Sequence, residues 1–277
     1  MGRAMKINFV TDSTTDVPQE FVERYNIRVV PTILVFEGKE YRDGVDITRA
    51  EFYQRLPSLR PLPTTAAPAS GDFESIYDSL EGAIISLHTA VSFTAVYTSA
   101  HIASEKFAGR VTVIDSGSLS LGAGWQVIAA AEAAAAGANV EEALKVIADV
   151  RKRVRVFALL DTLDNLRHSG RISLMRASIG ELLQIKPMVE VHESQLIARD
   201  QFRTRTKAIP SFIERMKLLG KFERLGVLYT DNIEPAKQVL EALGNHAPAD
   251  TIVNPITSTV GTHIGLNAVG VTGVLKA

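Results

Sequence analysis

Short apolar runs of strand length alternate with helical segments along most of this chain, and several of the runs end in loops crowded with hydroxyl side chains. Alternation of strands and helices favours a parallel sheet covered by helices. In such a sheet, loops at the carboxyl ends of the strands converge on one crevice where ligands bind. Hydroxyls and backbone N–H groups with few fixed charges suit a weakly charged anion such as a carboxylate. The hydroxyl-rich loops are 11–16, 63–65, 86–89, 115–118 and 257–263.

The pattern of elements changes near residue 161. Before it, we expect strands at 6–10, 27–35, 83–87, 110–114 and 153–160, with helices after an Asp16 N-cap and at 48–56, 92–107, 119–136 and 140–150. After it, we expect a hairpin of 188–192 with 195–199, helices at 206–219 and 235–243, and strands at 225–229, 251–255 and 269–275. The sequence therefore predicts an α/β fold with two domains. Residues 1–160 form a parallel, doubly wound N-terminal domain, and residues 161–277 form an α+β C-terminal domain.

Composition excludes several classes of function. The 277 residues include 30 basic and 31 acidic side chains, and the net charge of −1 argues against a nucleic-acid or membrane-surface partner. Cysteine is absent, so disulfides and thiol catalysis are excluded, and a reducing cytoplasm is the expected location. The most apolar stretch, 129–136, is too short to span a bilayer, so we expect no stable membrane insertion.

Signatures of catalysis, metals and cofactors are weak. The six histidines form no pair at i, i+4, and neither a phosphate-binding Gly-Lys loop nor a Gly-x-Ser-x-Gly elbow is present. We therefore expect no metal, no cofactor and no enzymatic activity. Asp12 and Asp16 could form a paired-carboxylate site, but satisfying N–H groups in a turn and at a helix start is the favoured interpretation. An enzyme with Asp12 and His263 as acid and base is the less favoured alternative.

The most specific motif of the chain is Leu166-Arg167-His168-Ser169-Gly170-Arg171-Ile172-Ser173. Further motifs lie at 11–16, 113–116 with 122–124, 160–165, 185–187, 203–205 and 261–265. Taken together, these segments resemble the DegV family of bacterial fatty-acid-binding proteins, and they follow one another in family order along the whole chain.

The resemblance implies two α/β domains with one long-chain fatty acid in an apolar tunnel between them, its carboxylate held by hydroxyls. It also implies that the protein presents the acid to a partner fatty-acid kinase related to dihydroxyacetone kinase, which makes an acyl phosphate. Arg203 and Arg205 match the family's basic strand-end motif and are the expected partner-binding residues. The expected ligand-binding residues are Thr65, Thr89, Ser92, Thr94, His263, Arg171 and Ser13.

The sequence departs from the family pattern at the polar head of the ligand. Thr65 corresponds to the family's carboxylate-binding threonine, but Ala66 replaces the serine beside it, and Ala90-Val91 stands where a serine pair is expected. A carboxylate buried without enough donors costs several kcal/mol, so substitute donors must exist or the ligand must differ. The alternative prediction is therefore a different lipid, or an apolar ligand with a neutral polar head, in the same tunnel.

Overall fold

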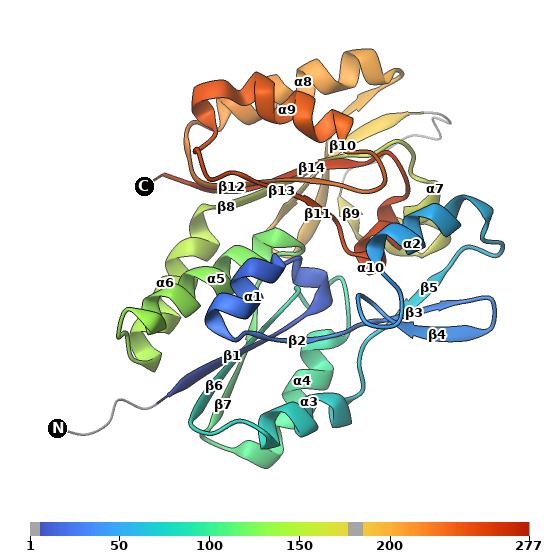
Figure 1. The fold of residues 1–277 in the computed structure, drawn as a ribbon. Coiled ribbons are helices and arrows are strands. Elements are labelled where there is room, and N and C mark those ends of the chain that lie inside the picture. Colours follow the sequence, from blue (N-terminus) through green and yellow to red (C-terminus); the bar gives the residue numbers. More distant parts are fainter. Residues whose placement is uncertain (1–5, 177–184, 277) are drawn as a thin grey trace.

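The N-terminal part of the chain is built on a parallel sheet. The computed structural model describes residues 6–176 and 185–276 (Figure 1). The four strands of this sheet lie in the order β2–β1–β6–β7, and every neighbouring pair is parallel. Helices α3 and α4 pack together on one side, whereas α1 and α5 lie on the other. The elements are β1 (Ile7–Asp12), α1 (Gln19–Tyr25), β2 (Arg28–Val30), α3 (Ser70–Asp78), β6 (Ala83–His88), α4 (Val96–Ser104), β7 (Val111–Asp115), α5 (Leu121–Ala135) and α6 (Val140–Arg153).

A mixed sheet of seven strands forms the C-terminal part. Its order is β13–β12–β14–β8–β10–β11–β9, and the predicted hairpin is present as the antiparallel pair β10–β11. Helices α8 and α9 cover its outer side. The elements are β8 (Val154–Leu159), α7 (Asp164–His168), β9 (Met175–Arg176), β10 (Lys186–His192), β11 (Gln195–Phe202), α8 (Arg205–Leu218), β12 (Phe222–Tyr229), α9 (Glu234–Leu243), β13 (Ile252–Pro255), α10 (Ser258–Ile264) and β14 (Val269–Leu275).

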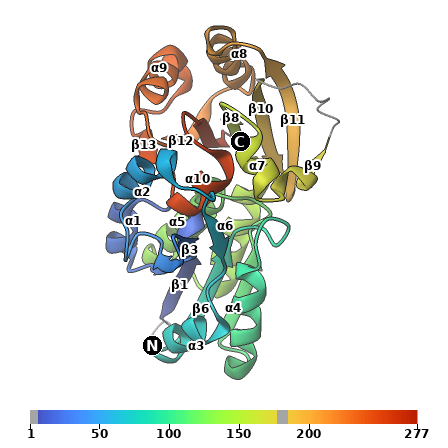
Figure 2. The same cartoon turned by 90° about the vertical axis from the view of Figure 1, so that its right-hand side faces the viewer.

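The predicted α/β fold is confirmed. The described residues also form a third, smaller sheet that the sequence analysis did not predict. This sheet has the order β4–β3–β5 and packs beside α2 and α10 (Figure 2). It contains β3 (Ile33–Phe36), β4 (Lys39–Arg42) and β5 (Thr64–Ala66), and α2 spans Arg49–Arg55. Short 3₁₀ turns occur at η1 (Ser13–Thr15), η2 (Leu56–Ser58), η3 (Glu105–Phe107), η4 (Arg171–Leu174) and η5 (Gly244–His246).

Several expected boundaries were wrong. The strand predicted over 27–35 divides at Pro31, which has no N–H to donate to a ladder, and its two halves belong to different sheets. The helix predicted from Ser92 begins only at Val96, because the preceding residues form a turn in which Phe93 N–H donates to Ala90. Pro18, not Asp16, occupies the N-cap of α1. Strand β8 pairs with β10 and β14, so the 153–160 strand belongs to the C-terminal sheet, while the domain division at residue 160 stays a prediction.

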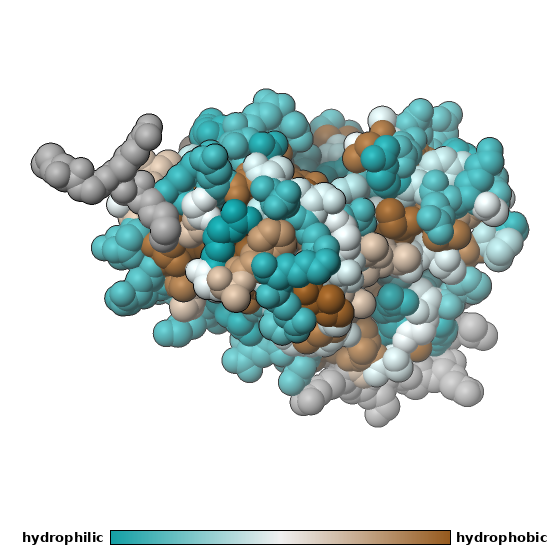
Figure 3. Space-filling view, turned by 90° about the horizontal axis from the view of Figure 1, so that it is seen from below, coloured by the Kyte–Doolittle hydropathy of each residue, from teal (hydrophilic) through white to brown (hydrophobic). Residues whose placement is uncertain are grey.

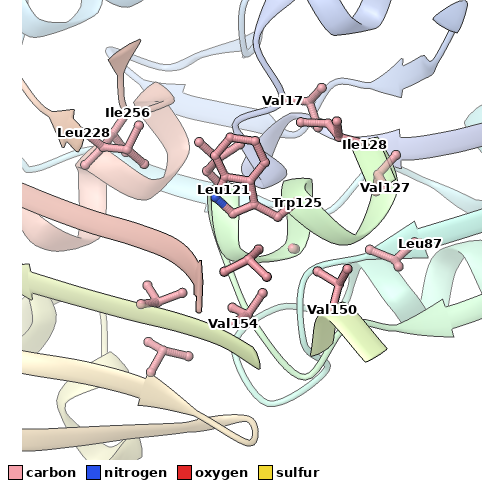
Figure 4. Packing of buried hydrophobic residues seen from close by; sticks show 14 of the residues in the cluster. Val17, Leu87, Leu121, Trp125, Val127, Ile128, Val150, Val154, Leu228 and Ile256 are labelled. Carbon is pink, nitrogen blue, oxygen red and sulfur yellow. The ribbon is translucent and has the colours of Figure 1, made fainter. Parts of the chain in front are cut away.

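Helix α5 joins the two larger sheets because it is buried on all sides. Its first eleven residues are buried, and it packs against β1 and β6 below and against β8 and β14 above. A helix in such a position must be apolar around its whole circumference, and small residues let the sheets approach. Trp125 donates from Nε1 to the backbone of Thr272 at 3.3 Å. Figure 4 shows Leu121, Trp125 and Ile128 of α5 among side chains that include Leu87 of β6, Val154 of β8 and Leu228 of β12.

On the face seen in Figure 3, apolar residues occur in small groups between polar and charged ones. None of the helices formed by residues 6–176 and 185–276 is long and apolar enough to cross a membrane.

We predict that Gly124→Ala destabilises the protein. A Cβ at this position would lie 2.6 Å from the carbonyl oxygen of Thr15, a backbone atom that cannot rotate away. Overpacking of this kind costs about 1–3 kcal/mol of unfolding free energy, which exceeds the gain in helix propensity. Denaturant unfolding measures the change. Gly71→Ala in α3 is the control, because a Cβ there meets nothing within 4 Å and should be neutral or stabilising. Equal effects of the two substitutions would contradict the prediction.

Candidate functional site

A cavity of about 260 Å³ lies between the carboxyl end of the N-terminal sheet and the C-terminal sheet. Helix α10, which contributes to its wall, lies between these two sheets in both ribbon views (Figures 1 and 2). Four of the five hydroxyl-rich loops supply lining residues, as the strand-end argument predicts; the 115–118 loop does not. The polar residues of the lining are Thr14, Thr32, Thr65, Thr89, Thr94, Arg171, Thr259 and His263.

The rest of the cavity wall is apolar. Its apolar residues come from β5, α7, η4, β10, β11 and α10 and from the loops after β5 and β8 and before α4 and α5. They are Ala66, Ala67, Phe93, Ala95, Leu119, Leu160, Leu166, Leu174, Val189, Leu196, Val260 and Ile264. A second, almost wholly apolar cavity of about 60 Å³ shares Leu119, Val189, Leu196, Val260 and Ile264 with the first. The two cavities therefore adjoin along a shared apolar wall, and the hydroxyls lie in the larger one.

Asp12 organises the hydroxyls at the end of β1. One carboxylate oxygen accepts from the backbone N–H and the hydroxyl of Thr14. The other lies 3.0 Å from His88 Nδ1 and accepts from the N–H of Thr89 at 3.3 Å. The Thr14 and Thr89 hydroxyls are 2.8 Å apart. Asp12 thus satisfies N–H groups in a turn, as the favoured interpretation of this residue predicts.

A second row of hydroxyls crosses from the N-terminal loop to α10. The Thr32 hydroxyl lies 2.7 Å from the hydroxyl of Ser13 and 2.7 Å from that of Thr259. Asp43 accepts from the backbone N–H of Thr259 at 2.9 Å. All four residues are buried, so this row links η1, the β2–β3 connection and α10 through buried hydrogen bonds.

Thr65, His263 and Arg171 form another polar corner of the cavity. Thr65 on β5 lies with its hydroxyl 3.0 Å from His263 Nε2. Burial, and secondarily the positive charge of Arg171, lowers the pKa of His263 to about 4, so the imidazole is neutral at pH 7. A neutral imidazole carries one N–H. Either His263 donates to Thr65, whose hydroxyl then faces the cavity as a donor, or Thr65 donates to Nε2 and Nδ1 carries the proton.

Asp16 holds the cavity loops together from behind. Its carboxylate accepts from the N–H of Thr257 at 2.7 Å and from the Ser120 hydroxyl at 2.6 Å. Burial raises the pKa of Asp16 to about 6, and Arg49, 3.6 Å away, opposes this rise. Tyr53 donates to the carbonyl of Ile256 at 3.0 Å. Helix α2 therefore fixes the turn that leads into α10.

The predicted ligand-binding residues divide into two groups. Thr65, Thr89, Thr94, Arg171 and His263 line the cavity together. The other two do not. Ser92 is exposed and donates to the carbonyl of Ser194 in the β10–β11 turn at 2.7 Å, and Ser13 lies in the buried hydroxyl row. Their roles in binding stay predictions.

The two predicted partner-binding arginines differ in their surroundings. Arg203 directly follows β11 and is exposed. Arg205 is half-buried, donates to the carbonyl of Asn267 at 2.5 Å and lies 3.6 Å from the carboxylate of Asp161. Arg205 therefore ties α8 to neighbouring loops, and Arg203 is the more available of the two.

Sequence reasoning missed some of the polar lining. Thr32 was not predicted, and its signal was only its place beside the Pro31 strand break. Thr14 and Thr259 lay in hydroxyl-rich loops without being singled out. The alternative acid–base pair is not assembled, because Asp12 contacts His88 whereas His263 contacts Thr65. Within residues 6–176 and 185–276, no group of three or more His, Asp or Glu side chains is placed to hold a metal ion.

Comparison with known proteins identifies the same family that the sequence motifs indicate. The profile of a family described as "Uncharacterised protein, DegV family" matches residues 6–276. The chain belongs to the DegV family. A DegV domain-containing protein from Caldanaerobacter subterraneus subsp. tengcongensis is 33% identical over 274 residues, which cover 96% of this chain and 98% of the relative.

Solved structures of DegV proteins have the same fold. A DegV family protein from Thermus thermophilus, described by its fatty acid binding, superposes with a TM-score of 0.88 at 29% identity and covers 98% of this chain and 100% of its own. DegV from Bacillus subtilis, described as a fatty acid binding protein, gives a TM-score of 0.88 at 28% identity, with coverage of 99% and 100%.

The depressed pKa of His263 predicts an acid-dependent loss of stability. Between its ordinary pKa of 6.5 and about 4, the unfolded state binds a proton that the folded state does not, so stability falls as pH falls through this window. Asp16 acts in the opposite sense, because its folded pKa of about 6 lies above 3.8 and the folded state gains the proton first. We therefore expect His263→Gln to lose less unfolding free energy than wild type when the pH falls from 6.5 to 4.5. The substitution leaves the contribution of Asp16 unchanged, so the difference between the two proteins reports on His263 alone.

Chemical unfolding at several pH values measures this difference. His101→Gln is the control, because His101 is exposed on α4 and should follow the wild-type pH profile. Parallel profiles for His263→Gln and wild type would contradict the prediction.

Proposed function

We propose that this protein binds one long-chain fatty acid, with the acyl chain in the adjoining apolar cavities and the carboxylate at the polar corner of Thr65, His263 and Arg171. The observation that carries the proposal is a cavity that combines an apolar wall with a small polar corner and adjoins a second apolar cavity. Burial of each methylene contributes about 0.8 kcal/mol, so a long chain supplies most of the affinity and the head supplies orientation. The fatty acid binding described for the Thermus thermophilus and Bacillus subtilis relatives supports the same ligand class.

The polar corner offers donors in place of the missing serines. Arg171 lines the cavity, and one of its guanidinium nitrogens donates to the carbonyl of Ser169 at 2.8 Å, which leaves other N–H groups for a ligand. When His263 donates to Thr65, the Thr65 hydroxyl is one further donor. Thr94, in the turn before α4, adds a hydroxyl. A cation and these donors suit a carboxylate, and they compensate for Ala66, Ala90 and Val91.

A neutral polar head in the same cavity is the second candidate. It is favoured by the neutral state of His263 at pH 7 and by the loss of three family hydroxyls at Ala66, Ala90 and Val91. Arg171 argues against it, since a guanidinium facing a neutral head lacks the counterion that a carboxylate provides.

The ligand is tested by native mass spectrometry of the purified protein, followed by lipid extraction. We expect one acyl molecule per chain, and we expect Thr65→Val to weaken fatty-acid binding by about tenfold or more, because a hydrogen bond to a charged group contributes about 1.5–3 kcal/mol. Isothermal titration of delipidated protein with palmitic acid measures the affinity.

Thr64→Val is the matched control, because the neighbouring Thr64 is exposed on the same strand and does not line the cavity. A released lipid without a carboxylate would favour the neutral-head alternative. Empty protein that no fatty acid stabilises would exclude both candidates.

We further propose that the bound acid is presented to a partner kinase related to dihydroxyacetone kinase, and that Arg203 contributes to the docking surface. Arg203 follows β11, which also supplies Leu196 to the cavity wall, so it is connected to the binding site by one rigid strand. Arginine suits such an interface because its planar guanidinium can donate several hydrogen bonds to an acidic partner.

Arg203→Ala is expected to leave fatty-acid binding intact while slowing acyl-phosphate formation by the cognate kinase. The defect should shrink as salt rises, because screening weakens the wild-type attraction. Phosphorylation kinetics at two salt concentrations, with lipid occupancy determined in parallel, measure both effects. Arg24→Ala removes the same charge from an exposed position on α1 and is the control. Wild-type phosphorylation by the Arg203 variant, or loss of its lipid, would contradict the proposal.

A further inference from the structure

Thr14 and Thr89 both line the cavity, and their hydroxyls lie 2.8 Å apart. They differ from Thr65 in whether a hydroxyl proton is left to donate to a ligand. Each threonine hydroxyl has one proton to donate and two lone pairs that accept. Which of these faces a ligand depends on the partners already present. For Thr14 and Thr89, hydrogen bonds within the protein determine whether a donor or an acceptor is left for a ligand.

The direction of the first hydrogen bond is set by Asp12. Its carboxylate is fully buried and accepts from two backbone N–H groups, those of Thr14 and Thr89, which can only donate. The hydroxyl of Thr14 donates to the same carboxylate. The single proton of Thr14 is therefore engaged, and in the 2.8 Å contact between the two hydroxyls Thr89 must be the donor.

The network behind Asp12 is consistent with this direction. His88 Nδ1 lies 3.0 Å from Asp12, His88 Nε2 lies 2.7 Å from the Ser86 hydroxyl, and that hydroxyl lies 2.7 Å from Tyr77. If Tyr77 donates to Ser86, Ser86 to Nε2 and Nδ1 to Asp12, every proton in the chain has an acceptor. The reverse direction would leave the buried Tyr77 proton without one among these groups. Donation thus runs toward Asp12 from both sides.

Both protons of the Thr14–Thr89 pair are used within the protein, so the pair can offer only lone pairs to the cavity. A carboxylate oxygen, which also offers only lone pairs, gains no hydrogen bond there. The Thr65 corner, with Arg171 beside it, offers donors. The polar lining therefore has a donor corner and an acceptor wall.

We propose that the Thr14–Thr89 wall is an acceptor subsite that receives a hydroxyl of the ligand, and that the preferred ligand is a fatty acid hydroxylated near its carboxylate. This inference rests on the proposed function, since it assumes that the acid occupies the cavity with its carboxylate at the donor corner. Asp12 acts as a positioning residue, because it fixes the direction of the hydrogen bonds without lining this cavity itself.

Competition between palmitic, 2-hydroxypalmitic and 3-hydroxypalmitic acids tests the subsite. We expect at least one hydroxy acid to bind wild-type protein about two- to tenfold more tightly than palmitic acid, the range that one additional hydrogen bond gives. In Thr89→Val the ratio of the hydroxy-acid affinity to the palmitic-acid affinity should approach one. Thr89→Ser, which keeps the hydroxyl, should restore the preference.

Thr65→Val provides the opposite pattern as a control. It should weaken all three acids together and leave their ratio unchanged, because its donor contacts the carboxylate they share. The subsite is overturned if neither hydroxy acid is preferred, or if the preference survives in Thr89→Val. Failure of every acid to bind wild-type protein would instead overturn the proposed function. Circular dichroism of each variant confirms that it is folded.

Discussion

The burial of α5 between two sheets is the constraint on which the rest of the molecule depends. Because the helix contacts β1 and β6 on one side and β8 and β14 on the other, it sets the spacing between the strand ends of one sheet and the face of the other. Gly122 and Gly124 allow that spacing, since a side chain at either position would collide with Val156 or with the backbone of Thr15. The cavity occupies the space that remains beyond the amino end of this helix, where its walls can come from both sheets at once.

Asp16 holds the loops that line the cavity against the helices behind them. A buried carboxylate is unfavourable unless its oxygens receive hydrogen bonds, and here Ser120 before α5 and Thr257 before α10 supply them. Arg49 and Tyr53 add contacts from α2. One side chain therefore connects four segments that are distant in the sequence, and the residual cost of burying it is visible in its pKa of about 6. The cavity loops can carry weakly held polar groups because they are fixed from behind by this interaction.

Local patterns were enough to predict the fold class and the convergence of most hydroxyl-rich loops, because both follow from strand–helix alternation. Contacts between distant residues were not predictable in the same way. Thr32 meets Thr259 across 227 positions, and Ser92 is turned away from the cavity by a carbonyl 102 positions later. Strand β5, which carries Thr65, has only three residues and exists through its pairing with β3, so no periodicity could indicate it. Thr65 was predicted from family resemblance instead.

Even a correct set of hydroxyls would leave the chemistry of the site undetermined. A threonine in a sequence is both donor and acceptor, and only its neighbours decide which capacity is left for a ligand. At Thr14 and Thr89 the decision is made by Asp12, whose carboxylate is surrounded by donors. At Thr65 it depends on the tautomer of a neutral His263. The same residue type thus lines one cavity with opposite hydrogen-bonding character, and the distinction arises from the buried groups behind the lining rather than from the lining itself.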